Sequence, residues 1–295
     1  MIHRTLASAK QIEPLMSTMH KPAGPEITPE LAERLLDDLC EVAVHASAAI
    51  LAVPFTQAGV RIKDDASPLT KADEASERII VEGLARLLPK LPVIAEESAA
   101  SAPSRVEQSC AIVDPLDGTK EFLAGRDEYT VNIGLVTRGA PIAGIITAPA
   151  QGLLWRGVIG RKAERLRINF AKGATATERT TIHVRSAPAE PVAAISRTHL
   201  DANSEAFLSG LKIHKRYACG SSVKFCHLAQ GDADIYPRLA PICEWDIAAG
   251  CAILAAAGGK VTDPKGGELR FASGAEKFRV PGFIAWGDPK IARTV

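Results

Sequence analysis

The feature that most constrains this chain of 295 residues is the segment Val113 to Phe122, which reads VDPLDGTKEF. Two carboxylates, Asp114 and Asp117, stand three residues apart at the end of an apolar run. The proline between them fixes a backbone φ angle, and Gly118 permits a sharp turn. Both carboxylates and the Leu116 carbonyl can therefore point at one place, which gives an all-oxygen site suited to Mg²⁺. The same residues are also typical of a surface turn, and the segment alone leaves both interpretations open.

Further acidic residues stand at the ends of predicted elements. Glu96 and Glu97 follow a short apolar run, Asp246 begins a predicted helix, and Asp73 lies in the first turn of another. Each has an ordinary alternative: solvation for the glutamates, helix capping for Asp246 and dipole stabilisation for Asp73. Together with segment 113–122, they indicate a shared cation site.

The apolar pattern predicts alternating helices and strands in both halves of the chain. The first helix is expected from Thr28 to Ala52, with Thr28 as its cap, and the second from Lys71 to Leu88. Further helices are expected over 202–211, 221–230 and 245–257, and strands over 92–95, 110–113, 130–137, 142–148, 153–159, 192–196, 213–218 and 233–237. Segment 161–185 is charged and poorly periodic, so no element is assigned to it.

Three parts of the chain are expected. Residues 1–27 form a flexible extension, 28–185 an N-terminal subdomain with most metal ligands, and 186–295 a C-terminal subdomain with the nucleotide pocket. The extension is polar, lacks the apolar core of a signal peptide and contains all three methionines, so the true start stays open.

Composition excludes several functional classes. The 35 basic and 34 acidic residues give a net charge of +1 without a basic cluster, so no nucleic-acid partner is expected. The six cysteines contain no C-x-x-C pair, which favours buried, reduced thiols over disulfides or structural zinc. No window approaches the ~18 apolar residues that span a bilayer. A cytoplasmic protein is expected, and peripheral contact with the inner face of the inner membrane stays open.

Taken in order, these motifs resemble the lithium-sensitive, Mg²⁺-dependent phosphatase superfamily that includes inositol monophosphatase and fructose-1,6-bisphosphatase. The resemblance covers nearly the whole chain from about residue 30 and rests on D-P-L-D-G-T at 114–119, E-E-S at 96–98 and W-D at 245–246. It implies an α/β fold, a five-layer αβαβα sandwich in two subdomains that meet at the site.

Four segments are similar to the bacterial bisphosphate nucleotidase branch of that superfamily. They are D-G-T-K-E-F at 117–122, G-S-S-V-K-F-C at 220–226, Y-P-R at 236–238 and S-R-T-H at 196–199. Inositol monophosphatases more typically continue with T-N-F after D-G-T. The last of the four resembles the segment that meets the nucleotide in such enzymes.

The resemblance implies two Mg²⁺ sites. Glu96, Asp114 and the Leu116 carbonyl correspond to the first, and Asp114, Asp117 and Asp246 to the second, with a third, weaker ion near Glu96. In such a two-metal arrangement one ion activates a water and the other offsets charge on the leaving oxygen. Inhibition by Li⁺ follows from its replacing Mg²⁺ at the second site.

The resemblance also assigns the remaining site residues. Asp73 and Thr119 correspond to the catalytic dyad that orients and deprotonates the attacking water. The nucleotide is expected to be held by eight residues, some through backbone N–H groups. They are Gly118, Thr119, Lys120, Ser196, His199, Gly220, Ser222 and Lys224. A solvated charge at Lys224 and an ordinary loop histidine at His199 are the alternatives, and Tyr236 and Arg238 are expected near the pocket without an assigned role.

The function implied is hydrolysis of adenosine 3',5'-bisphosphate to AMP and phosphate. The alternative is a phosphatase of the same superfamily acting on inositol 1-phosphate or fructose 1,6-bisphosphate. A non-catalytic nucleotide or RNA-associated binder is disfavoured, because it would be expected to lack a metal ligand or a dyad residue. The substrate is expected to be a small nucleotide, and both monomer and homodimer stay open.

Overall fold

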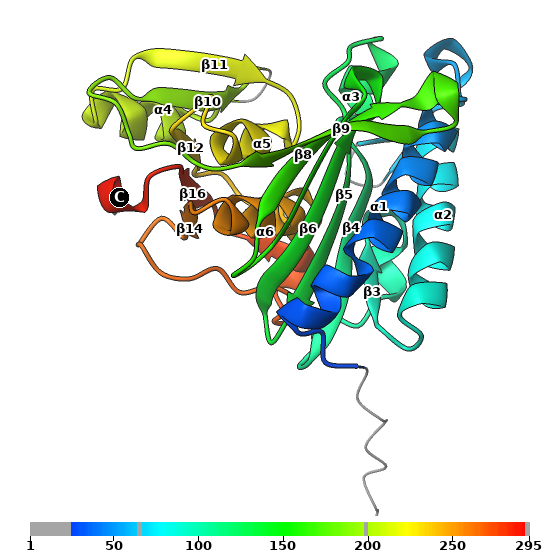
Figure 1. Cartoon of the computed structure of the whole chain (residues 1–295). Coiled ribbons are helices and arrows are strands. Elements are labelled where there is room, and N and C mark those ends of the chain that lie inside the picture. Colours follow the sequence, from blue (N-terminus) through cyan, green and yellow to red (C-terminus); the bar gives the residue numbers. More distant parts are fainter. Residues whose placement is uncertain (1–24, 64–66, 198–199, 293–295) are drawn as a thin grey trace, which may run out of the picture.

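The computed structural model describes residues 25–63, 67–197 and 200–292. A seven-stranded sheet and a five-stranded sheet alternate with layers of helices, as Figure 1 shows. The order of layers is helix, sheet, helix, sheet, helix. The predicted fold class, the αβαβα sandwich of the superfamily, is confirmed.

The described elements have the following bounds. The helices are α1 (Pro29–Leu51), α2 (Lys71–Leu87), α3 (Thr119–Leu123), α4 (Ala202–Gly210), α5 (Val223–Ala229) and α6 (Ala248–Ala256). The large sheet contains, in spatial order, β3 (Val93–Ala95), β4 (Ser109–Asp117), β5 (Thr130–Thr137), β6 (Ala140–Ala148), β7 (Leu153–Val158), β8 (Ala163–Asn169) and β9 (Thr175–Ile182). The small sheet contains β11 (Lys215–Cys219), β10 (Val192–Ser196), β12 (Ile235–Arg238), β16 (Phe283–Trp286) and β14 (Lys260–Thr262). Two short pairs complete the set: β1 (Arg61–Ile62) with β2 (Pro68–Leu69), and β13 (Ile242–Cys243) with β15 (Arg279–Val280).

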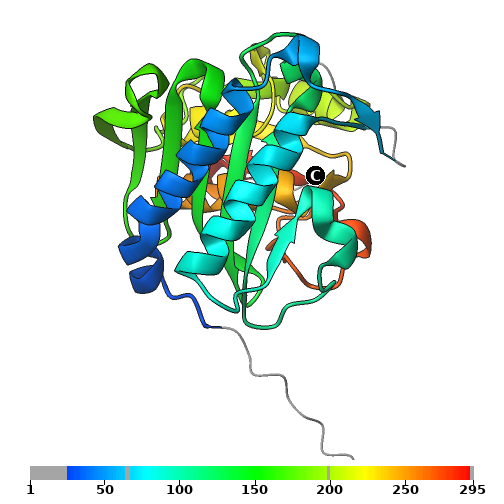
Figure 2. The same cartoon turned by 90° about the vertical axis from the view of Figure 1, so that its right-hand side faces the viewer.

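Two long helices, α1 and α2, cover the outer face of the large sheet (Figure 2). The side chain of Thr28 caps α1 by accepting a hydrogen bond from the N–H of Leu31 at 3.3 Å. Just before this helix, Ile27 is buried, and its backbone is hydrogen-bonded to the Ser109 and Thr137 hydroxyls of the sheet. The predicted bounds of both helices agree with the structure to within one residue.

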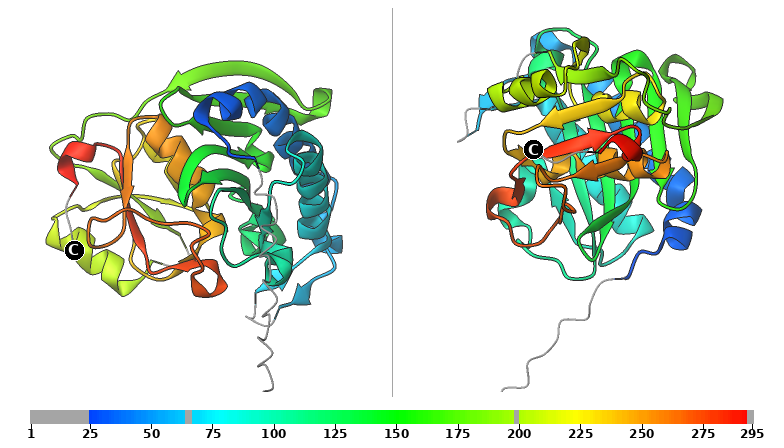
Figure 3. Two further views of the ribbon diagram at one scale, coloured as in Figure 1. Left: turned by 90° about the horizontal axis from the view of Figure 1, so that it is seen from below. Right: turned by 90° about the vertical axis from the view of Figure 1, so that its left-hand side faces the viewer.

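Helices α5 and α6 fill the space between the sheets, and α4 packs on the far face of the small sheet (Figure 3). Helix α6 is apolar all round and buried, since one side contacts β5 to β7 and the other contacts β14. This buried layer joins the two halves of the chain. The large sheet ends at Ile182 and the small sheet begins at Val192, so the predicted subdomain boundary at residue 185 falls between them.

Two strands, β8 and β9, lie in segment 161–185, to which the sequence analysis assigned no element. Strand β9 is at the edge of the sheet, and seven of its eight residues are exposed. An exposed edge strand needs no apolar face, and therefore apolar periodicity does not reveal it. Strands β14 and β16 were also not predicted, since both follow the last predicted element, which ended at residue 257.

The six cysteines all lie in the described residues, and each is a free thiol. Over the ranges that the structure describes, none of the helices combines the length and the apolar character needed to cross a membrane.

Candidate metal and phosphate site

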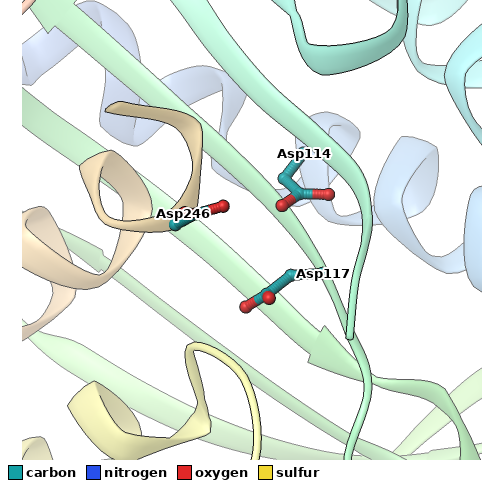
Figure 4. A group of neighbouring side chains, drawn as sticks. All are labelled: Asp114, Asp117 and Asp246. Carbon is teal, nitrogen blue, oxygen red and sulfur yellow. The ribbon is translucent and has the colours of Figure 1, made fainter. Parts of the chain in front are cut away.

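Three aspartates converge between the sheets. Asp114 and Asp117 come from the end of β4, and Asp246 comes from the 3-10 turn Glu244–Asp246 that leads into α6. Each offers a carboxylate oxygen, and these three oxygens lie within 4.8 Å of one another. Figure 4 shows the carboxylates facing a common space. We call Asp114, Asp117 and Asp246 the acidic group; chain segments far apart in sequence bring it together.

The backbone around β4 holds this geometry. The Leu116 N–H donates to Asp114 Oδ1 at 3.0 Å, and the Ser76 hydroxyl of α2 donates to the Pro115 carbonyl at 2.7 Å. The chain then turns at Gly118, whose φ of +93° is left-handed and unfavourable for other residues. The turn that the sequence predicted is therefore present, but it is half-buried and its acids point into the molecule.

The acidic group is electrostatically strained without a cation. Burial raises the pKa of Asp114 well above its ordinary value, and the charges of Glu96, Asp117 and Asp246 raise it further. Burial raises the pKa of Asp246 to about 8, with the charges of Asp117 and Glu96 adding to the shift. Burial also raises the pKa of Asp117, against the opposing effects of the Lys224 charge and the Ser222 N–H. Clustered carboxylate oxygens of this kind fit a hard divalent cation.

The metal-free protein is expected to lose stability as the pH rises. The pKa of Asp246, about 8 when folded, exceeds its ordinary value of 3.8, so the folded chain binds more protons than the unfolded chain between these values. The free energy of unfolding should therefore fall from about pH 4 to about pH 8, and Asp114 and Asp117 act in the same direction. Thermal unfolding in EDTA across this range measures the effect, and saturating Mg²⁺ should remove most of it. A metal-free Tm that rises with pH would contradict the raised pKa values.

Glu96 lies beside the acidic group but outside it. It begins the 3-10 helix Glu96–Ser101, directly after β3, and its Oε1 accepts a hydrogen bond from Lys63 Nζ at 2.6 Å. The same ammonium group lies 3.1 Å from both carboxylate oxygens of Glu97. Burial raises the pKa of Glu96, which the Lys63 charge opposes. A groove of about 1100 Å³ opens beside this pair and includes Trp245 in its wall.

Thr119 and Asp73 are in contact, as the resemblance implied. The Thr119 hydroxyl, at the start of α3, lies 3.2 Å from Asp73 Oδ1 and 3.2 Å from the Leu116 carbonyl. The second carboxylate oxygen of Asp73 accepts hydrogen bonds from the Thr70 N–H at 2.8 Å and hydroxyl at 2.5 Å, which caps α2. The hydrogen bonds to Thr70 and the contact with Thr119 therefore use different oxygens of Asp73, so its place in the first turn of α2 is compatible with a role at the site.

A pocket of about 120 Å³ adjoins the acidic group and includes Asp117 and Asp246 in its lining. Lys224 and Arg238 bring positive charge to it. The Lys224 side chain is buried; its Nζ donates to the carbonyls of Ser221 at 2.5 Å and Cys219 at 3.3 Å. Burial lowers the pKa of Lys224, opposed by nearby negative charge. An ammonium group and a guanidinium beside buried carboxylates form a place for an anion next to a place for a cation.

Most of the residues predicted to bind substrate line this pocket. Gly118, Ser196, Gly220, Ser222 and Lys224 are in its lining. Thr119 lies at the acidic group instead. Lys120 is exposed and is not part of the lining, and His199 lies outside the described residues.

Ser222 has a contact that the sequence did not suggest. Its backbone N–H donates to Asp117 Oδ2 at 2.6 Å, and its hydroxyl is 2.8 Å from that of Thr130 and 2.7 Å from Asn132 Oδ1. Since the side chain is only 3% exposed, the hydroxyl is already occupied within the protein. Ser222 thus holds a member of the acidic group in place.

Three residues at the site escaped assignment from sequence. Arg238 and Glu121 line the pocket, and Lys63 pairs with Glu96. The Y-P-R segment signalled Arg238, although its role was not assigned. The Arg238 Nε is buried and, over the described part of the chain, has no hydrogen-bond partner, which leaves a donor for a ligand. No motif in the sequence around Lys63 indicated that this residue would pair with Glu96.

Known proteins of similar sequence and structure share one family. The sequence model of the inositol monophosphatase family matches residues 32–286. The chain is 40% identical over 252 residues to the 3'(2'),5'-bisphosphate nucleotidase CysQ of Escherichia coli strain K12, covering 84% of this chain and 98% of that protein. It is 28% identical over 248 residues to inositol monophosphatase 2 of Solanum lycopersicum, covering 80% and 90% respectively. Among solved structures, CysQ from Bacteroides thetaiotaomicron, a bacterial member of the same family, superposes with a TM-score of 0.67 at 31% identity, covering 85% of this chain and 96% of that chain.

Proposed function

The chain belongs to the inositol monophosphatase family, and from this premise we propose that it hydrolyses adenosine 3',5'-bisphosphate to AMP and phosphate with Mg²⁺. Enzymes of the family are metal-dependent hydrolases of phosphate esters, and this chain is one of them. One observation favours a substrate with two phosphates: the pocket that shares Asp117 and Asp246 with the acidic group also contains Lys224 and Arg238. The 40% identity to a bisphosphate nucleotidase favours a nucleotide among such substrates. A substrate with two phosphates would place one at the metal site and the other against these two cations.

The metal ligands proposed are those that the family pattern assigns. Glu96, Asp114 and the Leu116 carbonyl would hold one Mg²⁺, and Asp114, Asp117 and Asp246 a second, with a weaker third near Glu96. The oxygen-only donor set and the mutual repulsion of the buried carboxylates support this assignment. When bound, Mg²⁺ would offset charge on the phosphoryl group and lower the pKa of a neighbouring water.

The catalytic roles fall to the two residues in contact. We assign Thr119 the task of orienting the attacking water and passing a proton toward Asp73, since a neutral hydroxyl alone is a poor base. Their 3.2 Å contact supports this, as does the burial that raises the pKa of Asp73 above its ordinary value. No covalent phosphoenzyme is needed in this scheme. Cys219 and Cys243 are poor nucleophiles, because burial raises the pKa of their thiols.

The nucleotide would be held mainly by the second half of the chain. Lys224 and Arg238 suit the non-scissile phosphate, and Gly118 and Gly220 line the same pocket. Ser196 lines the pocket where a ribose could reach it. Lys120 and His199 are further proposed contacts, and Ser222 would contribute through the hydrogen bond by which its N–H holds Asp117.

A phosphatase for inositol 1-phosphate or fructose 1,6-bisphosphate would use the same acidic group, so only the pocket distinguishes the candidates. The test is phosphate release from each of the three substrates with Mg²⁺, compared by kcat/KM. Preference for the nucleotide is the expected result. Preference for a sugar phosphate would keep the metal chemistry and refute the nucleotide pocket, whereas no release from any of them would refute the enzymatic assignment.

Li⁺ is expected to inhibit the reaction at concentrations on the order of millimolar. The second metal position, formed by Asp114, Asp117 and Asp246, is the one where Li⁺ would replace Mg²⁺ with half the charge. Initial rates at limiting Mg²⁺ with increasing LiCl measure the effect, and KCl at equal ionic strength is the control. Equal rates in the two salts would contradict the metal assignment.

A further inference from the structure

The two segments proposed to hold the nucleotide begin at adjacent strand ends. Strands β10 and β11 are parallel neighbours, and Ser196 at the end of β10 is in register with Cys219 at the end of β11. Two loops therefore leave the small sheet at the C-terminal ends of these strands, one through Arg197 and the other through Gly220. In α/β sheets, ligands characteristically bind outside the C-terminal ends of the strands, where the positions of the loops decide which ligand fits.

A residue that precedes a strand of the large sheet contacts both loops. Glu128, just before β5, receives two parallel hydrogen bonds from Arg197: Nε to Oε2 at 3.0 Å and Nη2 to Oε1 at 2.5 Å. The Arg197 Nη2 also donates to the Ala218 carbonyl at 2.9 Å, and the Arg197 N–H donates to the Cys219 carbonyl at 3.3 Å. The guanidinium of Arg197 thus ties Glu128 to the ends of both strands.

Gly220 packs directly on Glu128. A Cβ added to Gly220 would lie 2.8 Å from the Glu128 carbonyl oxygen and 3.0 Å from its Cβ, so a larger residue cannot enter without moving the loop. The Gly220 N–H also helps to keep the pKa of Glu128 below its ordinary value, after the larger effect of Arg197. The Glu128 carboxylate is consequently ionised at neutral pH and acts on both loops.

We infer that Glu128 is a positioning residue for the nucleotide pocket: through Arg197 and Gly220 it fixes the two loops that hold the substrate. The inference rests on the proposed function. Gly220 leads to Ser221, whose carbonyl accepts a hydrogen bond from the Lys224 ammonium group, so a displaced loop moves the cation assigned to the non-scissile phosphate. Arg197 follows Ser196, which lines the same pocket.

The pair is poorly explained by stability alone. The Arg197 side chain is 47% exposed and that of Glu128 16% exposed. Ion pairs that are this accessible to solvent contribute little to the free energy of unfolding. The effect of the Glu128–Arg197 pair should therefore appear in substrate binding. In the described structure Glu128 does not contact the acidic group, so the affinity of that group for Mg²⁺ should not change.

The test compares Glu128→Gln, Arg197→Met and the double variant in the full-length protein. Each single substitution is expected to raise KM for adenosine 3',5'-bisphosphate by about ten- to a hundredfold, the range for losing a charge-assisted hydrogen bond. The double variant should be no worse than the worse single variant, because both break the same contact. Both kcat and the Mg²⁺ concentration for half-maximal rate should stay within about twofold.

A matched control is the exposed ion pair between Arg167 and Glu178 on strands β8 and β9, 3.6 Å apart. Glu178→Gln should leave KM unchanged. If Glu128→Gln does not fold, Arg197→Met provides the same test from the more exposed partner. Wild-type turnover of the nucleotide with an unchanged KM in Glu128→Gln or Arg197→Met would overturn the inference, as would additive effects in the double variant. Absence of wild-type turnover would instead contradict the proposed function.

Discussion

Asp114→Asn is expected to lower kcat for phosphate release by about a thousandfold or more, while the metal-free protein becomes more stable to heat. Asp114 is 1% exposed and is the proposed bridge between the two ions. Asparagine has nearly the same shape, and its oxygen can still accept the Leu116 N–H. What it removes is the negative charge that the metal ions need.

The gain in stability has a separate cause. Burial and the charges of Glu96, Asp117 and Asp246 raise the pKa of Asp114. At a pH above the ordinary pKa of an aspartate, the folded chain must therefore either keep a proton on Asp114 or bear the repulsion between the carboxylates. A neutral amide has neither cost. Thermal unfolding in EDTA at about pH 8 should therefore give a higher Tm for Asp114→Asn than for the wild type.

A matched control for this substitution is Asp263→Asn. Asp263 holds a turn by accepting hydrogen bonds from the N–H groups of Lys265 and Gly267, both at 2.8 Å, and asparagine can accept them equally. Its kcat and metal-free Tm should be close to those of the wild type. Substantial turnover by Asp114→Asn, or a lower Tm than the wild type in EDTA, would contradict the role given to the acidic group.

The second large effect is expected for Thr119→Ala, which should lower kcat by about a hundred- to ten-thousandfold. The substitution removes the hydroxyl that contacts Asp73 at 3.2 Å, but it keeps the backbone N–H at the start of α3. KM and the Mg²⁺ requirement should therefore change much less than kcat. Single-turnover measurements with saturating substrate and Mg²⁺ separate the chemical step from binding.

Thr119→Ser is the control for this experiment, because serine restores the hydroxyl without the methyl group. It should recover most of the lost rate. If Thr119→Ala retained kcat within a few-fold of the wild type, or if Thr119→Ser were equally impaired, the hydroxyl would not be what prepares the attacking water.

The sequence contained enough to predict the acidic group and the family. Segment 113–122 places its acids at the end of an apolar strand, and that local pattern survives in the folded chain as the end of β4. The family resemblance is confirmed by the match over residues 32–286 and by the 40% identity to a bisphosphate nucleotidase. Local chemistry and an ordered set of motifs were sufficient for these inferences.

Contacts between distant segments could not be predicted in the same way. Glu128 and Arg197 are 69 residues apart, and although Arg197 belongs to the S-R-T-H segment, nothing in the sequence connects it to Glu128. Lys63 reaches Glu96 across 33 residues from a segment with no motif of its own. Such pairs arise from the packing of distant segments against one another, which periodicity within a single element does not specify.

The division at residue 185 and the individual roles of the site residues stay predictions, and substitutions test these roles one residue at a time.

The exposed edge strand β9 shows a further limit of apolar patterns, since its threonines favour a strand but supply no buried face.

The central claim is that the acidic group and the adjacent cationic pocket together cleave one phosphate from a nucleoside bisphosphate. The most direct measurement is the identity and amount of the products formed from adenosine 3',5'-bisphosphate by the purified protein, with Mg²⁺ and with EDTA. The expected result is AMP that carries the 5'-phosphate and an equal amount of inorganic phosphate, formed only with Mg²⁺. Loss of the 5'-phosphate instead, equal turnover in EDTA, or no products under either condition would contradict it.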